Sequence, residues 1–384
     1  MKVSLTDICD FQGGTQPPKD EWIDQPAQGY VRMLQIRDFT QSDKNYIEYV
    51  KDTGKLKTCI EDDILIGRYG ASIGKILTGL AGAYNVAIVK TIPDEKVVSK
   101  KYLYWYLNSQ YFQRFISNVG SRAAQAGFNK NDLGAAQIPL VDKERQEEIC
   151  EVLEKANKLI SLRKQQLAKL DELIKARFVE MFGDFEFNPK EFPVYHLCEL
   201  CDVGSSKRIY QEEQSISGIP FLKVADLNEL IDTGKYSCST FIPLERYEQL
   251  LHKELTPTEN DILITSRGTL GKCYIVQSDD EFYFQDGMIS WLSNFSPKVS
   301  SIYISYLFAQ PYIQKQIESL QAGSTVAYLS IAMLKKINVI LPPKKLQDDF
   351  ATFVEHVDQQ KQTVQQSLEK LELMKKALMQ EYFG

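Results

Sequence analysis

The sequence predicts an α+β protein that is built twice: two lobes related by a pseudo-twofold axis and separated by a pair of long antiparallel coiled-coil helices. Three observations predict this class. The stretch 146–183 returns at 347–384 with a constant offset of 201 and no gap, the segments that precede the two copies also resemble each other, and short strand-like runs dominate those segments. We therefore expect the order lobe, helix, lobe, helix along the chain.

Both repeated stretches have the pattern of a coiled-coil helix. Steps of four and three residues pick out ten positions in each copy, and eight of the ten are apolar in both. The polar exceptions are offset: Arg163 and Arg177 align with apolar residues of the second copy, and Lys361 and Lys375 align with apolar residues of the first. This offset favours pairing between the two copies, because each long basic side chain can extend past an apolar neighbour. At about 1.5 Å per residue each helix would be roughly 57 Å long, the length of a spacer.

The lobes repeat as well. Segment 63–75 matches 261–272, with one residue fewer in the second copy, and 98–116 aligns with 299–317. Alternating apolar runs bounded by Gly, Asp and Pro predict short strands, and an amphipathic pattern near 102–116 predicts one helix. We divide the chain into a first lobe, a central helical region, a second lobe and a C-terminal helical region, at residues 1–141, 142–183, 184–341 and 342–384.

The composition predicts a cytoplasmic protein. No apolar run approaches the roughly 18 residues that a membrane span needs, and seven scattered cysteines suit free thiols in a reducing compartment. The net charge is −6. Such a charge counts against a free-standing nucleic-acid binder, so any role on DNA would have to use local basic loops or a basic partner.

The sequence lacks a recognisable active site. Residues 70–75 (GASIGK) do not form a phosphate loop, because three residues rather than four separate the glycines and Ile76 follows the lysine. Cys198 and Cys201 have no further zinc ligands at a plausible spacing, which favours buried structural cysteines. Only three histidines occur, and none is repeated between the lobes. Acid–base and nucleophilic catalysis are therefore not expected.

The repeated segment 63–75 is the strongest candidate for a functional loop. It predicts a strand, a glycine turn and a second strand, with Arg68 and Lys75 displayed at the turn and Arg267 and Lys272 in the second copy. Arginine side chains can make bidentate contacts with base edges, and lysines more often hold phosphates. The alternative is an ordinary hairpin whose charges are simply solvated.

The chain as a whole resembles the specificity (S) subunit of bacterial type I restriction-modification systems. The resemblance covers the duplication, the segment LPPKKLQ at 341–347 with its variant LVDKERQ at 140–146, and the helix ending RFVEMFGD with its echo LMQEYFG. One departure is that Val141 and Asp142 replace the prolines usual at the first helix start.

The resemblance implies a non-catalytic DNA-binding protein. In that family the two lobes are target-recognition domains that each read one half of an asymmetric bipartite site, and the helices fix the length of the unread spacer. Two methyltransferase (M) subunits would dock on the helices, and restriction/translocase (R) subunits would join the complex. S-adenosylmethionine would bind to M, and ATP and magnesium to R, so that this chain itself would carry no cofactor.

Two sets of residues are candidates for these roles. For DNA binding, the glycine turns, the polar segments near the end of each lobe and one loop of the second lobe supply Arg68, Lys75, Gly120, Ser121, Arg122, Gln125, Ser206, Lys207, Arg267, Lys272, Ser324 and Thr325. For binding M, a second apolar stripe on the helices supplies Val152, Leu159, Leu173, Phe353 and Met374.

Other classes of protein remain possible at this point. The specificity subunit of a type IIB-like or phage-defence methyltransferase complex would have the same sequence features. A coiled-coil scaffold that does not bind DNA would explain the helices, but it would not explain two large lobes with repeated polar loops. A standalone enzyme would require the catalytic motifs that the sequence lacks.

Overall fold

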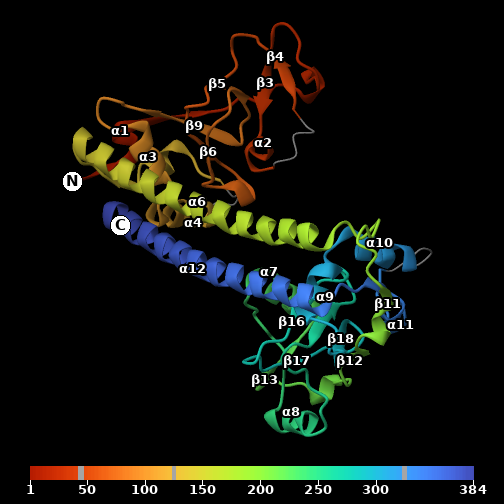
Figure 1. Ribbon diagram of the computed structural model, residues 1–384. Coiled ribbons are helices and arrows are strands. Elements are labelled where there is room, and N and C mark those ends of the chain that lie inside the picture. The colour runs from red at the N-terminus through yellow and green to blue at the C-terminus, as the bar shows by residue number, and fades with distance from the viewer. Residues whose placement is uncertain (42–46, 123–126, 322–326) are drawn as a thin grey trace. The chain divides into compact units, whose positions relative to one another are not determined.

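The computed structural model describes residues 1–41, 47–122, 127–321 and 327–384. The chain divides into two compact units, Met1–Gln166 with Val364–Gly384 and Leu167–Thr363. The helices α6 (Lys143–Phe182) and α12 (Lys344–Phe383) have 40 residues each, and each contributes one part to both units (Figure 1). In the described part of the chain, no helix combines the length and the apolarity that crossing a membrane requires.

In its described residues, the first unit contains three small sheets. Its first four-stranded sheet has the order β2-β9-β6-β7 and is antiparallel throughout, the second has the order β4-β3-β8-β5 with β3 and β8 parallel, and β1 pairs with β10. The strands are β1 (Lys2–Ser4), β2 (Cys9–Gly13), β3 (Tyr30–Leu34), β4 (Tyr49–Lys51), β5 (Thr58–Cys59), β6 (Leu65–Gly67), β7 (Ile76–Leu77), β8 (Gly82–Tyr84), β9 (Ile88–Pro93) and β10 (Gln137–Pro139).

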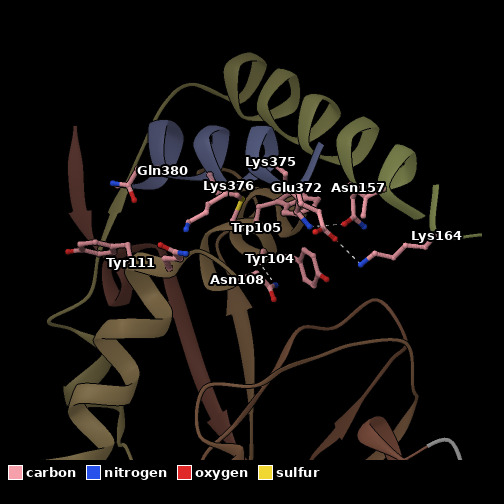
Figure 2. Close-up of a pocket in the computed structure, with 14 residues that line it drawn as sticks. Tyr104, Trp105, Asn108, Tyr111, Asn157, Lys164, Glu372, Lys375, Lys376 and Gln380 are labelled. Carbon is pink, nitrogen blue, oxygen red and sulfur yellow. Dashed lines mark hydrogen bonds and ion pairs between the residues drawn. The ribbon is translucent and has the colours of Figure 1, made fainter. Parts of the chain in front are cut away.

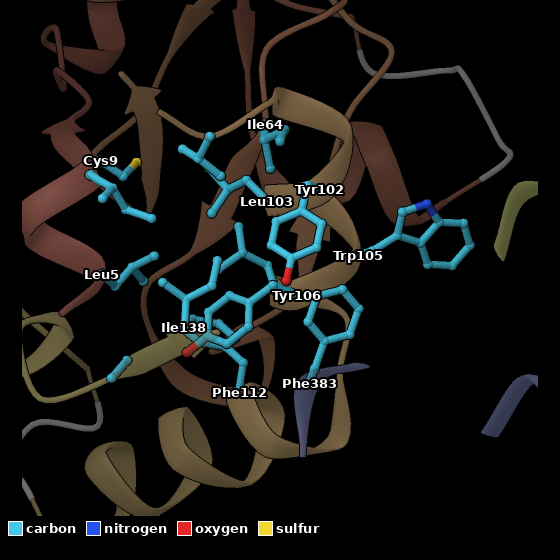
Figure 3. Packing of buried hydrophobic residues seen from close by; sticks show 14 of the residues in the cluster. Leu5, Cys9, Ile64, Tyr102, Leu103, Trp105, Tyr106, Phe112, Ile138 and Phe383 are labelled. Carbon is cyan, nitrogen blue, oxygen red and sulfur yellow. The ribbon is translucent and has the colours of Figure 1, made fainter. Parts of the chain in front are cut away.

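The shorter helices described in this unit are α1 (Leu5–Ile8), α2 (Ile36–Thr40), α3 (Lys100–Leu107), α4 (Gln110–Arg122) and α5 (Lys130–Leu133). A large hydrophobic core lies around α3, where Tyr102, Leu103 and Tyr106 are fully buried (Figure 3). Phe383, from the end of α12, packs into the same core with its ring centroid 5.1 Å from that of Tyr102. The lobe and the helix pair therefore share one hydrophobic core in this unit.

The second unit repeats this plan. A four-stranded sheet has the order β12-β18-β15-β16, a three-stranded sheet has the order β14-β13-β17 with β13 and β17 parallel, and β11 pairs with β19. The strands are β11 (Val194–His196), β12 (Asp202–Ser205), β13 (Ile219–Leu222), β14 (Phe241–Ile242), β15 (Ile262–Thr265), β16 (Cys273–Ile275), β17 (Tyr283–Phe284), β18 (Ile289–Ser293) and β19 (Asn338–Ile340). The helices are α7 (Val224–Thr233), α8 (Leu244–Leu251), α9 (Ser301–Phe308), α10 (Pro311–Leu320) and α11 (Ile331–Lys335).

The two long helices pair with each other, as the sequence predicts. In the first unit the start of α6 lies beside the end of α12, with an ion pair of 3.0 Å between Lys164 and Glu372 (Figure 1). In the second unit the end of α6 lies beside the start of α12, where Lys361 and Asp171 are 2.7 Å apart. Most of the predicted seam is buried: Ile149, Leu153, Ala156, Ile160, Leu170, Ile174, Met181, Phe350, Val354, Val357, Val364 and Leu368. The predicted α+β class and the antiparallel coiled coil are confirmed.

The ends of two helices show where the sequence pattern and the structure differ and how α6 stops. The single helix expected near 102–116 is wrong, because the chain breaks after α3 and starts again as α4. Asn108 and Ser109 cause the break: the Ser109 Oγ accepts a hydrogen bond from the Phe112 N–H at 3.2 Å and so caps the second helix. Gly183 ends α6 with a φ of 84°, and its N–H donates to the Val179 carbonyl, as is typical of a glycine after the last turn of a helix.

Candidate nucleic-acid interface

Each lobe carries a β-hairpin at the place where the sequence predicts a strand-turn-strand. Strands β6 and β7 pair in the first lobe, and β15 and β16 pair in the second. The turns need glycine for two reasons, a positive φ and a close neighbour. Gly74 has a φ of 77°, and a Cβ there would lie 2.5 Å from the Ile116 Cγ2; Gly271 has a φ of 76° and would meet the Ile317 Cδ1 at 2.8 Å. The repeated glycines therefore let each hairpin pack closely on α4 or α10.

In the first hairpin, only part of the hydrogen-bonding capacity of Arg68 is available for contacts with DNA. Arg68 is half-buried, its Nε donates to the Phe128 carbonyl at 2.9 Å, and its guanidinium lies 5.0 Å from the centroid of the Tyr69 ring. The neighbouring Tyr69 forms an isolated β-bridge with Gly127. Part of the donor capacity of Arg68 thus holds the hairpin to the segment that begins at Gly127.

The arginine of the second hairpin is more exposed. Arg267 forms the corresponding β-bridge with Tyr328, and its guanidinium lies 5.5 Å from the centroid of that ring. A tyrosine face holds the guanidinium plane while leaving its edge donors open. Arg267 is therefore better placed than Arg68 for a bidentate contact.

The two predicted lysines also differ. Lys75 is exposed, whereas the Nζ of Lys272 lies 2.7 Å and 2.8 Å from the two carboxylate oxygens of Asp232 on α7. A DNA phosphate near Lys272 would have to compete with this carboxylate. The two turns therefore have the same backbone arrangement but differ in which basic side chains are free to contact DNA.

The other predicted loop residues have varied surroundings. Ser206 is buried and its hydroxyl donates to the Phe284 carbonyl at 2.7 Å, so its Oγ already has a structural role, while the Lys207 side chain is exposed. Arg208 beside it was missed; it is exposed, with its Nε 2.8 Å from an Asp286 oxygen, and its adjacency to Lys207 was the available signal. Gly120, Ser121 and Arg122 end α4, but their side chains, like the whole of Gln125, Ser324 and Thr325, lie outside the described residues.

The Cys198 and Cys201 pair does not resemble a metal site. Cys201 is buried, as expected, and burial raises the pKa of its thiol to about 12, which disfavours the thiolate that zinc binds. Cys198 is exposed, so the expectation that both are buried is wrong for this residue. Within the described ranges, no group of three or more His, Cys, Asp or Glu side chains is arranged to hold a metal ion.

The predicted second apolar stripe lies on the surface of the helices. Val152, Leu159, Leu173 and Met374 are each 39–46% exposed. Phe353 is half-buried, and the guanidinium of Arg177 lies 5.7 Å from the centroid of its ring. Three further exposed apolar residues on the same helices were missed: Leu162, Val179 and Leu373.

A cavity of about 520 Å³ lies in the first unit between α3 and the adjoining parts of α6 and α12 (Figure 2). The Nζ of Lys375 donates to the Asn157 Oδ1 at 2.7 Å and lies 5.3 Å from the Trp105 ring centroid. Burial lowers the pKa of Lys375, with a smaller contribution from the charge of Lys164. Lys375 is thus a partly buried cation whose hydrogen-bond acceptor is a neutral amide.

Comparisons with known proteins all point to one family. Residues 1–172 and 189–373 both match the family described as the type I restriction modification DNA specificity domain. The type I restriction enzyme MjaVIII specificity subunit of Methanocaldococcus jannaschii is 25% identical over 403 residues, covering 98% of this chain and 90% of that protein. The MjaIX specificity subunit of the same organism is 22% identical over 385 residues, covering 91% and 85%.

Solved structures show the same fold. The S subunit of a type I restriction-modification system from M. genitalium has a TM-score of 0.57 at 16% identity, covering 100% of this chain and 96% of that one. A chain from the type I R-M system, studied for its complex assembly and conformational transition, has a TM-score of 0.62 at 14% identity, covering 100% and 97%. Because the family match covers both halves, the chain belongs to the type I restriction modification DNA specificity family.

Proposed function

We propose that this chain is the DNA-reading subunit of a type I restriction-modification complex and that its two lobes, residues 1–141 and 184–341, each read one half of an asymmetric bipartite site. The observation that carries the proposal is the duplicated hairpin. In each lobe it presents an arginine beside a tyrosine ring, at Arg68 and at Arg267. Because the two turns differ in exposed charge, the two half-sites should differ in sequence.

Base reading is assigned to the arginines and phosphate contacts to the lysines. Arg267 has open donors for a bidentate contact with a guanine edge, and Arg68 would have to keep or exchange its bond to the Phe128 carbonyl. Lys75 and Lys207 are exposed and suited to phosphates. Lys272 can contact a phosphate only after its ion pair with Asp232 breaks, so it should contribute less to DNA affinity than Lys75 or Lys207. The loops that include Gly120, Ser121, Arg122, Gln125, Ser324 and Thr325 stay part of the proposed interface on their sequence alone.

The helical regions, residues 142–183 and 342–384, are assigned two roles. One is a ruler that sets the length of the unread spacer, since the geometry of the protein determines how far apart two half-sites can lie. The other is docking of two M subunits on the exposed stripe that includes Val152, Leu159, Leu173 and Met374. Phe353, half-buried beneath Arg177, would join this stripe if that guanidinium moved aside.

The chemistry is assigned to the partners. The M subunits would supply S-adenosylmethionine and methyl transfer, and R subunits would supply ATP, magnesium and cleavage. A net charge of −6 supports this division, because a chain with this charge gains little from counterion release unless basic partners also contact the phosphates. The proposed site of action is the cytoplasm, where such complexes meet DNA.

The test is an exchange of lobes. Residues 1–141 are replaced by the corresponding lobe of another family member, the chimera is produced with its M subunits, and the methylated motif is determined by sequencing the methylome. We expect one half-site to change while the other half-site and the spacer stay the same. The matched control exchanges residues 184–341, which should change the opposite half-site. If either chimera altered both half-sites, the independent-lobe proposal would be wrong.

A further inference from the structure

Two glutamines occupy equivalent and unusual positions at the starts of the long helices. Gln146 is the fourth residue of α6 and Gln347 is the fourth residue of α12, and both are 0% exposed. A primary amide buried this completely is costly unless its donors and acceptor are all satisfied. The same side chain at the same place in both halves therefore needs a specific reason.

Each amide bonds to three backbone groups of its own half, and the three groups are at equivalent places in the two halves. The Gln146 Oε1 accepts from the Ser99 N–H at 2.9 Å, and its Nε2 donates to the carbonyls of Val97 and Val141, each at 2.9 Å. Ser99 is the N-cap of α3, and Val141 lies two residues before Lys143, the first residue of α6. One side chain thus ties a lobe helix, the loop before that helix and the connection into α6.

The second half repeats this arrangement. The Gln347 Oε1 accepts from the Ser300 N–H at 2.9 Å, and its Nε2 donates to the carbonyls of Lys298 at 3.0 Å and Pro342 at 2.7 Å. We call each set of three bonds an amide clamp. Because every partner is a backbone group, neither clamp depends on which side chains the lobe carries.

A tyrosine reinforces each clamp from the lobe side. The Tyr102 hydroxyl of α3 donates to the Pro139 carbonyl at 2.7 Å, and the Tyr303 hydroxyl of α9 donates to the Ile340 carbonyl. Pro139 and Ile340 each end the strand that leads into the long helix. The connection between lobe and helix is therefore held from both sides within each unit.

We infer that Gln146 and Gln347 are positioning residues that fix the angle between each reading lobe and the long helix that follows it, and that they thereby make the complex selective for one spacer length. The inference rests on the proposed function. One added base pair moves a half-site by about 3.4 Å and rotates it by roughly a tenth of a turn. A lobe that could pivot on its helix would accommodate such a change, whereas a clamped lobe would not.

The experiment measures spacer selectivity in full-length variants assembled with their M subunits. Gln146→Met and Gln347→Met keep the length of the side chain and remove all three bonds, and the matched controls are Gln165→Met in α6 and Gln360→Met in α12, which lie on the exposed surface. Duplexes carry the half-sites found by methylome sequencing, with spacers of the native length and one base pair longer or shorter. Methylation rates, melting temperature and base preference in each half-site are measured for every protein.

The expected result is a loss of discrimination between spacers. The ratio of the methylation rate at the native spacer to the rate at a spacer one base pair longer should fall about tenfold in each clamp variant, because three unpaired backbone groups no longer favour a single lobe angle. Base preference within both half-sites should stay unchanged, since the clamps lie outside the hairpins. Both control variants should keep the native ratio.

Two outcomes would overturn the inference. One is an unchanged spacer ratio in a folded clamp variant. The other is an equal loss of rate at every spacer together with a lower melting temperature, which would mean that the clamps contribute only stability. Gln146→Asn, which keeps a shortened amide, gives the same readout if the methionine variant does not fold. If the wild-type complex methylated duplexes irrespective of their spacer, the proposed function itself would fail, and the clamp inference would fail with it.

Discussion

Two lysines in the seam of α12 should affect stability in opposite directions when each is replaced by methionine. The Nζ of Lys361 lies 2.7 Å from an Asp171 oxygen and 3.5 Å from an Asp358 oxygen. Burial alone would lower the pKa of Lys361, but the hydrogen bond and charge of Asp171 raise it above its usual range. Among the described residues, the hydrogen-bond acceptor of Lys375 is the neutral Asn157, and burial lowers the pKa of Lys375. Relative to the unfolded chain, folding therefore stabilises the charged form of Lys361 and destabilises the charged form of Lys375.

The magnitudes follow from these surroundings. Lys361→Met leaves the carboxylates of Asp171 and Asp358 without their cation. Because these two side chains are about half exposed, the free energy of unfolding should fall by about 1 kcal/mol rather than by the 3–5 kcal/mol expected for a fully buried pair. Lys375→Met removes a charge that burial disfavours and keeps an apolar side chain of similar length. We therefore expect the free energy of unfolding to rise by about 0.5–1 kcal/mol, a gain that the lost contact with the Trp105 ring reduces. Lys370→Met, on the exposed face, is the matched control and should change little.

Differential scanning calorimetry and urea unfolding would measure these changes. A change of 1 kcal/mol corresponds to roughly 2–4 °C for a unit of this size. The raised pKa of Lys361 means that its stabilisation is present at neutral pH and is lost as the pH rises through that raised value, whereas the penalty from Lys375 is relieved as the pH rises through its lowered value. The difference between the two variants should therefore shrink at alkaline pH. If both substitutions destabilised the protein equally at neutral pH, the argument from their different partners would be refuted.

Three further predictions concern DNA, the ruler and the partners. Arg267→Ala should cost about 1–3 kcal/mol of affinity for the cognate duplex and little for a scrambled one, whereas Lys75→Ala should weaken both and reduce the salt dependence, as titrations at two salt concentrations would reveal. Equal losses on both duplexes for Arg267→Ala would remove it from base reading. Four residues inserted after both Lys164 and Gln365 lengthen each helix by about 6 Å. The unread spacer in the methylated motif should then grow by one or two base pairs of about 3.4 Å each, and an active variant with an unchanged spacer would contradict the role of the helices as a ruler. Leu159→Glu should lower the number of bound M subunits from two to one in native mass spectrometry, and a wild-type complex with one M would count against duplicated docking sites.

The sequence predicts the repeated architecture well because the repeat is visible without any structure. The apolar positions of both long helices recur with one offset, and the residues at those positions, from Ile149 to Leu368, are largely buried. The sheets are less predictable. Parallel pairing of β3 with β8, for example, joins residues about 50 positions apart through two residues of each strand, and no local sequence pattern specifies such a partner.

The candidate interface is only partly predictable, because a charge in a sequence carries no information about its partner. Lys75 and Lys272 occupy matching positions, yet within the described parts of the chain it is Lys272 that meets a carboxylate, from α7 some 40 residues earlier. Ser206 appears in the sequence as one more polar loop residue, but tertiary packing buries it. Gln146 and Gln347 were overlooked because a glutamine in a first helical turn usually faces water. Their recurrence at the same offset of 201, within the two related helix starts, was the available signal.

The clamps also account for how lobes can differ while the helices stay similar. The Gln146 and Gln347 amides bond only to backbone groups, so a lobe needs only a helix start at the right place to be held. The hairpins, by contrast, differ in side-chain surroundings even between the two lobes of this chain, as Arg68 and Arg267 illustrate. Lobe exchange should therefore succeed when the junction keeps the glutamine on the helix side, as exchanges ending at residue 141 or at residue 341 do. A junction placed after Gln146 that imports another residue there should retain the half-site preference of the new lobe and lose spacer selectivity.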